Sequence, residues 1–178
     1  DRLGVLVWQD MPSMPNTPST AQQTQFQTEL QAMVNQHRSS PSIIMWVPFN
    51  EGWGQYNTAA ITNLVKGWDP SRLVNNASGW TDAGAGDVID FHCYLGPCSP
   101  TPTSTRIAAM GEFGGLGLKV AGHEWDAANS HSYTIESSVA NLVSHYVSLL
   151  QQSEGLVSEP GLSAAVYTEI TDVETEVN

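Results

Sequence analysis

The sequence predicts an α/β protein, arranged as a partial (β/α)8 TIM barrel, and two observations lead to this prediction. Short apolar stretches of strand length alternate with longer segments whose apolar residues recur at helical spacing, which is the pattern of a parallel sheet covered by helices. Six strands are expected in 178 residues, whereas a complete eight-stranded barrel takes about 250 residues. We therefore expect strands 3 to 8 of the barrel, without the first two β/α units and the last helix.

The expected strands are apolar runs that end at polar or turn-forming residues. Ile43–Val47 is uninterrupted in its apolar character, as is typical of a strand buried on both faces of a parallel sheet, and Pro48 and Gly52 end it. Because all strands of a parallel barrel end on one face, the residues that follow them are expected to share a rim. The strands are expected at Leu3–Trp8, Ile43–Val47, Leu73–Asn75, Val88–Tyr94, Ile107–Met110 and Ser163–Tyr167.

Three helices are expected between these strands, each from apolar residues at helical spacing. In the first of them Phe26, Leu30 and Val34 share one face. The segment 76–87 is too short for a full helix, and the segments 12–20 and 116–130 are expected to be loops. The helices are expected at Thr20–Gln36, Tyr56–Trp68 and Tyr133–Gln152.

The composition argues against several classes of partner. With 40% hydrophobic and 13% charged residues the chain is typical of a folded globular protein. Six Lys and Arg stand against eighteen Asp and Glu, and the resulting net charge of −12 argues against nucleic acid or an anionic membrane surface as partner. No apolar run approaches the roughly 20 residues that a membrane span needs. A neutral carbohydrate substrate would be indifferent to this charge.

The ends of the chain and its cysteines bear on its origin. The chain starts at Asp1 without a methionine and stops at Asn178 without a closing element, so we expect an internal piece of a longer protein whose N-terminal part is missing. Cys93 and Cys98 either close a small loop disulfide in an oxidising compartment or remain two unlinked thiols. Asn76 begins a glycosylation sequon, which is a weak signal. The low lysine content, the acidic charge balance and the Cys pair favour a secreted, extracellular protein.

Three carboxylates follow expected strands and point to chemistry at the barrel rim. Asp10, Glu51 and Glu112 each come after an apolar run, where packing explains a carboxylate poorly because an unpaired buried charge is costly. Paired carboxylates surrounded by Trp, Tyr and His are the usual machinery of glycoside hydrolysis. One of them protonates the leaving oxygen, while the other attacks the anomeric carbon or activates water. Glu51 and Glu112 are the expected pair.

Four motifs follow one another along the chain in a recognisable order. They are Val-Trp-Gln-Asp-Met-Pro at 7–12, Pro-Ser-Ile-Ile-Met-Trp at 41–46 running into Asn-Glu-Gly-Trp-Gly at 50–54, Asp-Pro-Ser-Arg at 69–72, and Gly-Glu-Phe-Gly-Gly at 111–115. Together they resemble the catalytic barrel of glycoside hydrolase family 2, the family of β-galactosidases, β-glucuronidases and β-mannosidases. Each motif alone is weak, but jointly they cover nearly the whole chain. The resemblance implies that residues 1–178 belong to one catalytic barrel domain.

The resemblance also implies roles for individual residues. Glu51 is expected to be the general acid/base and Glu112 the nucleophile of a retaining mechanism, which requires their carboxyl groups to lie about 5–5.5 Å apart. Tyr94 is expected to hold the nucleophile ionised, and Asn50 to hydrogen-bond the 2-hydroxyl of the sugar. Glu169 departs from the pattern, which leads us to expect Gln at this position. The residues expected to contact the sugar are Asp10, Asn50, Trp53, His92, Tyr94 and Trp125.

The function expected from the sequence is retaining hydrolysis of terminal β-glycosides by a β-galactosidase-type enzyme, with neither an organic cofactor nor a metal. One alternative is a catalytically inactive barrel fragment or carbohydrate-binding remnant that keeps the motifs without closing its pocket. Another is a metal-dependent hydrolase built on His92, His123 and His131, whose spacing matches no tight ligand motif. Asp10 also fits a residue that caps a loop, and His92 also fits a buried structural histidine.

Overall fold

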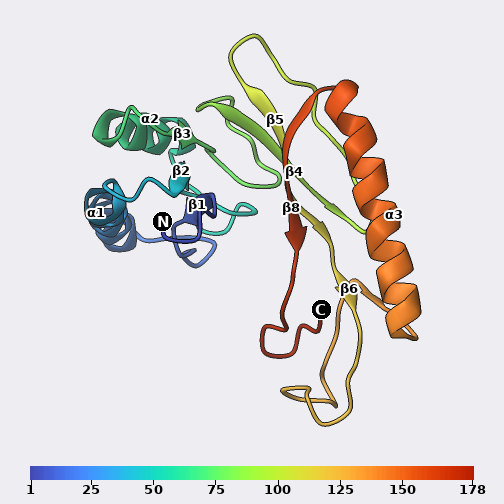
Figure 1. Ribbon diagram of the computed structural model, residues 1–178. Coiled ribbons are helices and arrows are strands. Elements are labelled where there is room, and N and C mark those ends of the chain that lie inside the picture. Colours follow the sequence, from blue (N-terminus) through green and yellow to red (C-terminus); the bar gives the residue numbers. More distant parts are fainter. The chain divides into compact units, whose positions relative to one another are not determined.

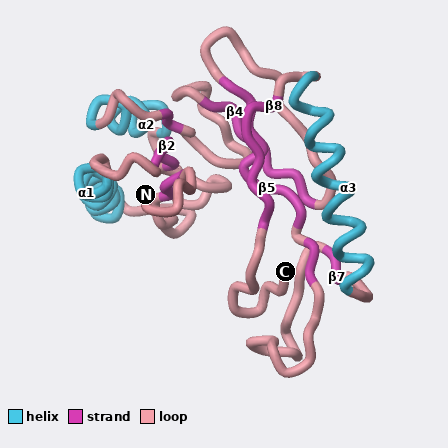
Figure 2. Tube along the Cα trace, in the orientation of Figure 1, coloured by secondary structure: helices cyan, strands magenta, loops and turns pink.

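All 178 residues are described by the computed structural model of the protein, and they form two compact units. The first comprises Asp1–Asp90 and Thr103–Ile107, and the second comprises Phe91–Pro102 and Ala108–Asn178. Helices and strands alternate through much of the chain, and strands pair in parallel in both units (Figures 1 and 2). The α/β class predicted from the sequence is therefore confirmed.

The first unit is a three-stranded parallel sheet next to two helices. Its strands pair in the order β1-β2-β3, and they are β1 (Val7–Asp10), β2 (Ile43–Val47) and β3 (Leu73–Val74). α1 (Thr20–His37) connects β1 to β2, and α2 (Thr58–Trp68) connects β2 to β3. The two helices lie side by side (Figure 1). The central position of β2 explains why its residues are apolar without interruption.

The core of the first unit forms where the two helices meet β2. Trp46 is completely buried, and its indole Nε1 donates a hydrogen bond to Asp69 Oδ2 at 3.1 Å. Burying one large aliphatic or aromatic side chain contributes about 1.5–3 kcal/mol, so a cluster of this size supplies much of the driving force for folding. The buried apolar residues of the cluster are Met11, Phe26, Leu30, Val34, Ile43, Trp46, Phe49, Ile61, Val65, Val74 and Ala77.

A different local feature sets the start of each helix in this unit. Ser19 forms a capping box at α1, in which its Oγ accepts a hydrogen bond from the Gln22 N–H at 3.3 Å and Gln22 Oε1 accepts one from the Ser19 N–H at 2.8 Å. The predicted start at Thr20 is confirmed. α2 begins at Thr58, two residues later than predicted, because Asn57 has a left-handed φ of 41° that a right-handed helix does not contain.

The Asp-Pro-Ser-Arg motif has a structural role in the first unit. The Arg72 guanidinium donates to the carbonyl oxygen of Ile43 at 2.6 Å and forms an ion pair of 2.7 Å with Asp69. The buried Asp69 carboxylate accepts hydrogen bonds from the side chains of Ser71, Arg72 and Trp46. Burial alone raises the pKa of Asp69, but these hydrogen bonds outweigh it and lower the pKa to about 2. The motif thereby ties the end of α2 to the start of β2.

We expect Asp69 to make the free energy of unfolding depend on pH in the acidic range. Because the pKa of the folded carboxyl lies below its ordinary value of 3.8, the ionised group stabilises the fold by about 2 kcal/mol above about pH 4. This contribution is lost as the pH falls from about 4 to about 2. Urea unfolding across this range measures it. Asp69→Asn should remove this part of the acid dependence, whereas Glu29→Gln, at an exposed carboxylate on α1, should keep it; equal acid dependence in both variants would contradict the assignment.

The second unit is built on a sheet with the strand order β4-β5-β8. β5 and β8 pair in parallel, and α3 lies alongside β8 (Figure 1). A smaller parallel sheet joins β6 and β7, which are separated by a long loop (Figure 2). The elements are β4 (Val88–Tyr94, of which Phe91–Tyr94 belong to this unit), β5 (Ile107–Gly114), β6 (Leu116–Gly117), β7 (Thr134–Ile135), α3 (Val139–Ser158) and β8 (Leu162–Thr168).

The strands agree with the prediction most closely where they are long and apolar. The predicted bounds Ile43–Val47 and Val88–Tyr94 are confirmed. The first strand, however, begins at Val7 rather than Leu3. The Val7 N–H donates to Ser42 O at 2.8 Å, next to the start of β2, whereas Leu3 is 82% exposed. The fifth predicted strand does not stop at Met110 but continues to Gly114.

The last helix begins six residues later than predicted. Ser138 caps it by accepting a hydrogen bond from the Asn141 N–H at 3.2 Å, so α3 starts at Val139 rather than Tyr133. Thr134 and Ile135 pair with β6 instead. Among the apolar residues of α3, Leu149 is buried, whereas Val139, Val143 and Leu150 are exposed.

Three further features bear on the sequence-based expectations. Cys93 and Cys98 form a disulfide, which decides between the two alternatives left open for them. The Asn76 side chain is buried and donates to Asp82 Oδ1 at 2.8 Å, so the first residue of the sequon has a structural role. No helix combines the length and the apolar character that crossing a membrane requires.

Candidate active site

Glu112 lies in β5 at an irregular point of its pairing with β8. Met110 lies opposite Ala165. The next paired residue of β5, Phe113, lies opposite Tyr167, so three steps along β5 correspond to two steps along β8. The extra residue makes a β-bulge, a feature that re-aims side chains and is enriched next to active sites. The sequence placed Glu112 after the strand, whereas the structure keeps it within the strand at this bulge.

Two side chains of β4 contact the Glu112 carboxylate. The Tyr94 hydroxyl donates a hydrogen bond to Glu112 Oε2, and His92 Nδ1 lies 3.4 Å from the same oxygen. The His92 side chain is fully buried, whereas 27% of the Glu112 side chain is exposed. His92 and Tyr94 share one face of β4 because side chains alternate along a strand. The structure thus brings together three of the residues predicted for the site.

The Tyr94 hydroxyl keeps its proton at neutral pH and so remains a hydrogen-bond donor to Glu112. Burial raises the pKa of its hydroxyl above the ordinary value of 10.0, and the hydrogen bond to Glu112 and the negative charge of that carboxylate raise it further. The Tyr94 hydroxyl therefore stays protonated at neutral pH. A donor of this kind favours the ionised form of the carboxylate that accepts from it. An ionised, partly exposed carboxylate is the state in which this group acts as a nucleophile.

Glu169 adds a further carboxylate at the end of β8. Its Oε1 accepts a hydrogen bond from Asn178 Nδ2 at 3.1 Å. Burial raises the pKa of Glu169, and the negative charges of nearby carboxylates raise it further, in the order Glu176, Glu112 and Asp172. The charge at Glu169 is therefore coupled to the charge at Glu112.

We expect Glu169→Gln to increase stability at neutral pH. Since folding raises the pKa of this carboxyl above its ordinary value of 4.5, its contribution to stability is fully present below about pH 4.5 and is lost as the pH rises through the folded-state pKa. Gln retains the acceptor for Asn178 without the charge. Urea unfolding between about pH 4 and pH 8 tests this. Glu159→Gln, at an exposed carboxylate beyond α3, is the matched control, and an equal change in both variants would refute the coupling.

In the first unit, the backbone of Glu51 is held by the segment that follows β3. The Glu51 N–H donates to Ser78 O at 2.9 Å, and the Ser78 N–H donates to Phe49 O at 2.9 Å. Trp80 Nε1 donates to Glu51 O at 3.1 Å. Glu51 has a φ of 51°, in the left-handed region, which costs a residue other than glycine about 1–3 kcal/mol. Such strain is concentrated at functional sites.

Asn50, the residue before Glu51, has a buried polar atom without a partner. No hydrogen bond reaches its Oδ1, although leaving such an acceptor unpaired costs about 1–3 kcal/mol. The Oδ1 of Asn75 is also buried and unpaired. The Asn75 amide nitrogen and the Ser78 hydroxyl donate to the buried Asp90 Oδ2, at 2.6 Å and 2.8 Å. An unmet acceptor at Asn50 fits a residue that receives a hydrogen bond from a ligand hydroxyl.

The other predicted site residues lie on exposed parts of the chain. Asp10 ends β1 and is exposed, and Trp53 lies exposed in the turn after Glu51. Trp125 is 78% exposed in the loop between β6 and β7. Both Trp rings offer an apolar face of the kind on which sugars stack. None of these three residues contributes to the contacts of Glu112 described above.

The three histidines considered for a metal site lie in different environments. The His92 side chain is buried beside Glu112. His123 and His131 are exposed on the loop between β6 and β7, and His131 Nδ1 lies 3.4 Å from the carbonyl oxygen of Asn129. This placement favours a role for His92 at the Glu112 carboxylate.

Two neighbours of Tyr94 were missed by sequence reasoning. The ring of Tyr133 stacks on that of Tyr94, and the Thr168 side chain at the end of β8 hydrogen-bonds the Tyr94 hydroxyl. The sequence predicts Tyr133 in the first turn of a helix, whereas the structure places it directly before β7. The available signal was the pair Ser137-Ser138, which is a good helix cap and leaves Tyr-Thr-Ile at 133–135 as a strand-forming segment.

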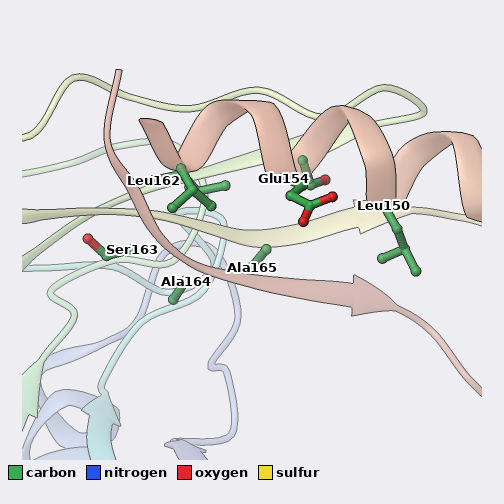
Figure 3. Close-up of a pocket in the computed structure, with 8 residues that line it drawn as sticks. Leu150, Glu154, Leu162, Ser163, Ala164 and Ala165 are labelled. Atoms are coloured by element: carbon green, nitrogen blue, oxygen red, sulfur yellow. The ribbon is translucent and has the colours of Figure 1, made fainter. Parts of the chain in front are cut away.

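A cavity away from these residues lies between α3 and β8. It has a volume of about 320 Å³, and none of the residues predicted for the site lines it (Figure 3). α3 contributes Leu150 and Glu154 among others, and β8 contributes Leu162–Ala165. With a single carboxylate and otherwise apolar or hydroxyl side chains, it lacks the paired carboxylates of a glycosidase site.

Comparison with solved structures defines the class of fold. The β-glucuronidase of Parabacteroides merdae matches with a TM-score of 0.66 and 18% identity over 93% of this chain and 24% of that chain. An FMN-binding β-glucuronidase from Facaelibacterium prausnitzii L2-6 matches with a TM-score of 0.69 and 17% identity over 99% and 31% of the two chains. A β-galacturonidase from Eisenbergiella tayi, with bound galacturonate, matches with a TM-score of 0.57 and 16% identity over 91% and 33%. The fold is therefore that of part of these longer chains, and this chain spans about a quarter to a third of their length.

The family follows from the sequence itself. The family description "Glycosyl hydrolases family 2, TIM barrel domain" matches residues 6–103, which is more than half of the 178 residues. The chain belongs to family 2 of the glycosyl hydrolases and to its TIM barrel domain. The matched stretch contains Glu51 and Tyr94, and Glu112 lies beyond it. No curated protein sequence matches the chain significantly.

Proposed function

We propose that the protein hydrolyses β-glycosides with retention of configuration and that Glu112 is its nucleophile. The observation that carries this proposal is the hydrogen bond from Tyr94 to the Glu112 carboxylate at the β5 bulge. A hydroxyl that remains protonated keeps the carboxylate ionised. The partial exposure of Glu112 leaves it accessible to substrate. The Glu112 oxygen forms a bond to the anomeric carbon, and the aglycone oxygen leaves; water then displaces Glu112 from the same carbon.

Glu51 is proposed as the general acid/base of this reaction. In the first step it donates its proton to the departing aglycone oxygen, and in the second it takes a proton from the attacking water. The hydrogen bonds to its backbone and its left-handed conformation support a fixed position for this side chain. The unpaired Asn50 Oδ1 supports the proposed contact with the sugar 2-hydroxyl. Asp10, Trp53, His92 and Trp125 are proposed as further sugar contacts.

A neutral sugar of the β-galactoside type is the proposed substrate. The solved structures with a similar fold are named as β-glucuronidases and a β-galacturonidase, and an acidic sugar needs a cationic partner for its carboxylate. Three of the six Lys and Arg residues already form ion pairs with Asp residues, namely Lys66, Arg72 and Arg106. In the second unit the only Lys or Arg is Lys119, whose Nζ donates to Ser130 O at 3.0 Å. This charge distribution favours a neutral ring.

We further propose that residues 1–178 correspond to strands 3 to 8 of a (β/α)8 barrel domain. The family match and the share of the similar chains that is covered support this proposal. Catalysis then requires the parent protein, in which the earlier barrel strands complete the pocket.

The test is turnover by the full-length protein of aryl β-galactoside and aryl β-glucuronide, with the product anomer followed by proton NMR. Hydrolysis of the galactoside with release of the β-anomer first is the expected result. If the α-anomer is released first, the mechanism is inverting and not retaining. Sugar binding without any turnover would favour the carbohydrate-binding alternative, and loss of turnover with a chelator would favour the metal-dependent one.

A further inference from the structure

We propose that Tyr133 is a positioning residue of the Glu112 site and acts by holding the ring of Tyr94. This inference rests on the proposed function, in which Glu112 is the nucleophile. The ring centroids of Tyr94 and Tyr133 lie 3.6 Å apart with an angle of 3° between the ring planes, so the rings are stacked face to face. Tyr94 is the residue whose hydroxyl donates to Glu112. Tyr133 thus contacts Tyr94, and its effect on the Glu112 carboxylate is exerted through the Tyr94 hydroxyl.

The residues on either side of Tyr133 are hydrogen-bonded to the segment that follows β5. Ser132 Oγ donates to Gly115 O at 2.8 Å. The Thr134 N–H donates to the same carbonyl oxygen at 3.2 Å. The parallel pairing of β6 with β7 continues this attachment. Because Ser132 and Thr134 are both hydrogen-bonded to Gly115 O, the position of Tyr133 is restrained and its ring is held against that of Tyr94.

Gly115 provides the space that this arrangement needs. A Cβ at this position would lie 2.5 Å from Tyr133 Cδ2 and 3.0 Å from Tyr133 Cβ, which real atoms do not tolerate. Gly115 also has a φ of +68°, a conformation that glycine adopts without steric cost. Gly115 lies three residues after Glu112. The same short segment therefore carries the carboxylate and leaves room for the Tyr133 ring, which packs on the hydrogen-bond donor Tyr94.

The stack matters because a hydrogen bond from a ring hydroxyl depends on the orientation of the whole ring. Misplacing a catalytic contact by about 1 Å can cost about 100-fold in rate. The role assigned to Tyr133 uses the face of its ring, so its own hydroxyl is not needed and Phe should replace it. Tyr133 is 52% exposed. A ring that is half in solvent contributes less to the core than a buried one does, and this exposure favours the positioning role over a purely structural one.

A Tyr133 substitution leaves unchanged the identity of the other titratable side chains of the second unit that lie near Glu112. They are His92 and Tyr94 on β4 and Glu169 at the end of β8, whose pKa responds to the charge of Glu112. A shift of the acidic limb of the pH–rate profile in a Tyr133 variant therefore reports on the Tyr94 hydrogen bond.

The experiment measures kcat, KM and the pH profile on an aryl β-glycoside for five variants of the full-length protein, one of which is Tyr94→Phe alone. Tyr133→Ala should lower kcat about 10- to 100-fold with little change in KM and move the acidic limb to higher pH. Tyr133→Phe should retain the wild-type values. In a Tyr94→Phe background, Tyr133→Ala should have no further effect, because its effect acts through the Tyr94 hydroxyl. Ile135→Ala, which removes an exposed apolar side chain from β7, should retain wild-type activity.

Two results would overturn the inference: an undiminished effect of Tyr133→Ala in the Tyr94→Phe background, or a Tyr133→Ala enzyme no slower than Ile135→Ala. If Tyr133→Ala does not fold, Tyr133→Leu fills the same space without a flat ring and is judged by the same criteria. A failure of the proposed function is distinguishable, since wild type would then be inactive or Glu112→Gln would remain active. In that case the loss of the ring-current shift on the Tyr94 ring protons in Tyr133→Ala still tests the stack.

Discussion

Replacing Glu112 by alanine should lower kcat on an activated aryl β-glycoside by about 10⁴-fold or more, which corresponds to at least about 5.5 kcal/mol of lost transition-state stabilisation. The Glu112 oxygen forms the bond to the anomeric carbon in the proposed first step. Tyr94 and His92, which contact this carboxylate, cannot substitute for it, because the Tyr94 hydroxyl stays protonated and the His92 side chain is buried. Steady-state kinetics of the full-length protein measures the loss.

Added azide distinguishes loss of the nucleophile from loss of the fold in this variant. In Glu112→Ala, azide should enter the vacated space and attack the anomeric carbon as the aryloxide leaves, which gives the α-glycosyl azide from a β-glycoside. Glu154→Ala, at an exposed carboxylate on α3, should retain wild-type activity. Substantial activity of Glu112→Ala without azide would contradict the assignment of the nucleophile.

Replacing Glu51 by alanine should lower the rate by about 10³-fold for substrates with poor leaving groups and much less for those with good ones. The reason is that only a poor leaving group needs the proton that Glu51 donates in the first step. The dependence of kcat/KM on the leaving-group pKa measures this difference. The basic limb of the pH–rate profile should also disappear, since that limb reports on ionisation of the general acid.

Azide again gives a distinct outcome for the Glu51 variant. With Glu112 intact the glycosyl-enzyme still forms, so azide should displace Glu112 in a second step and yield the β-glycosyl azide. Glu29→Ala, at an exposed carboxylate in the same unit, should behave as wild type. A uniform loss across all leaving groups would instead assign Glu51 a binding or structural role.

The strands that the sequence predicts accurately are those specified by local composition. Ile43–Val47 is a continuous apolar run between turn-forming residues, and Val88–Tyr94 ends at the turn-forming Leu-Gly-Pro segment. The boundaries that were wrong depend on partners far along the chain. Val7 starts β1 because it bonds to Ser42, and the same apolar character in Leu3 has no strand partner. No pattern confined to residues 1–10 distinguishes the two.

In the candidate site, too, local sequence predicts some features, whereas others depend on contacts with distant segments. Glu112 was predicted because a carboxylate after an apolar strand stands out in the sequence, and Tyr94 was predicted because the resemblance to glycoside hydrolase family 2 implies a Tyr beside the nucleophile. The bulge that carries Glu112 arises from pairing of β5 with β8, and the ring that holds Tyr94 comes from β7. Both result from contacts between segments separated by tens of residues, which residue types and spacing do not reveal.

The Cys93–Cys98 disulfide affects how the protein should be produced. The two cysteines flank Tyr94, so the bridge closes the short loop that begins with the residue donating to Glu112. Reducing cytoplasm keeps thiols unlinked, whereas the periplasm and the secretory pathway allow disulfides to form. Expression in an oxidising compartment, with free-thiol titration of the purified protein, is therefore the sound starting point for preparing it. Material made in a reducing host should be oxidised before its kinetics are compared with those of any variant.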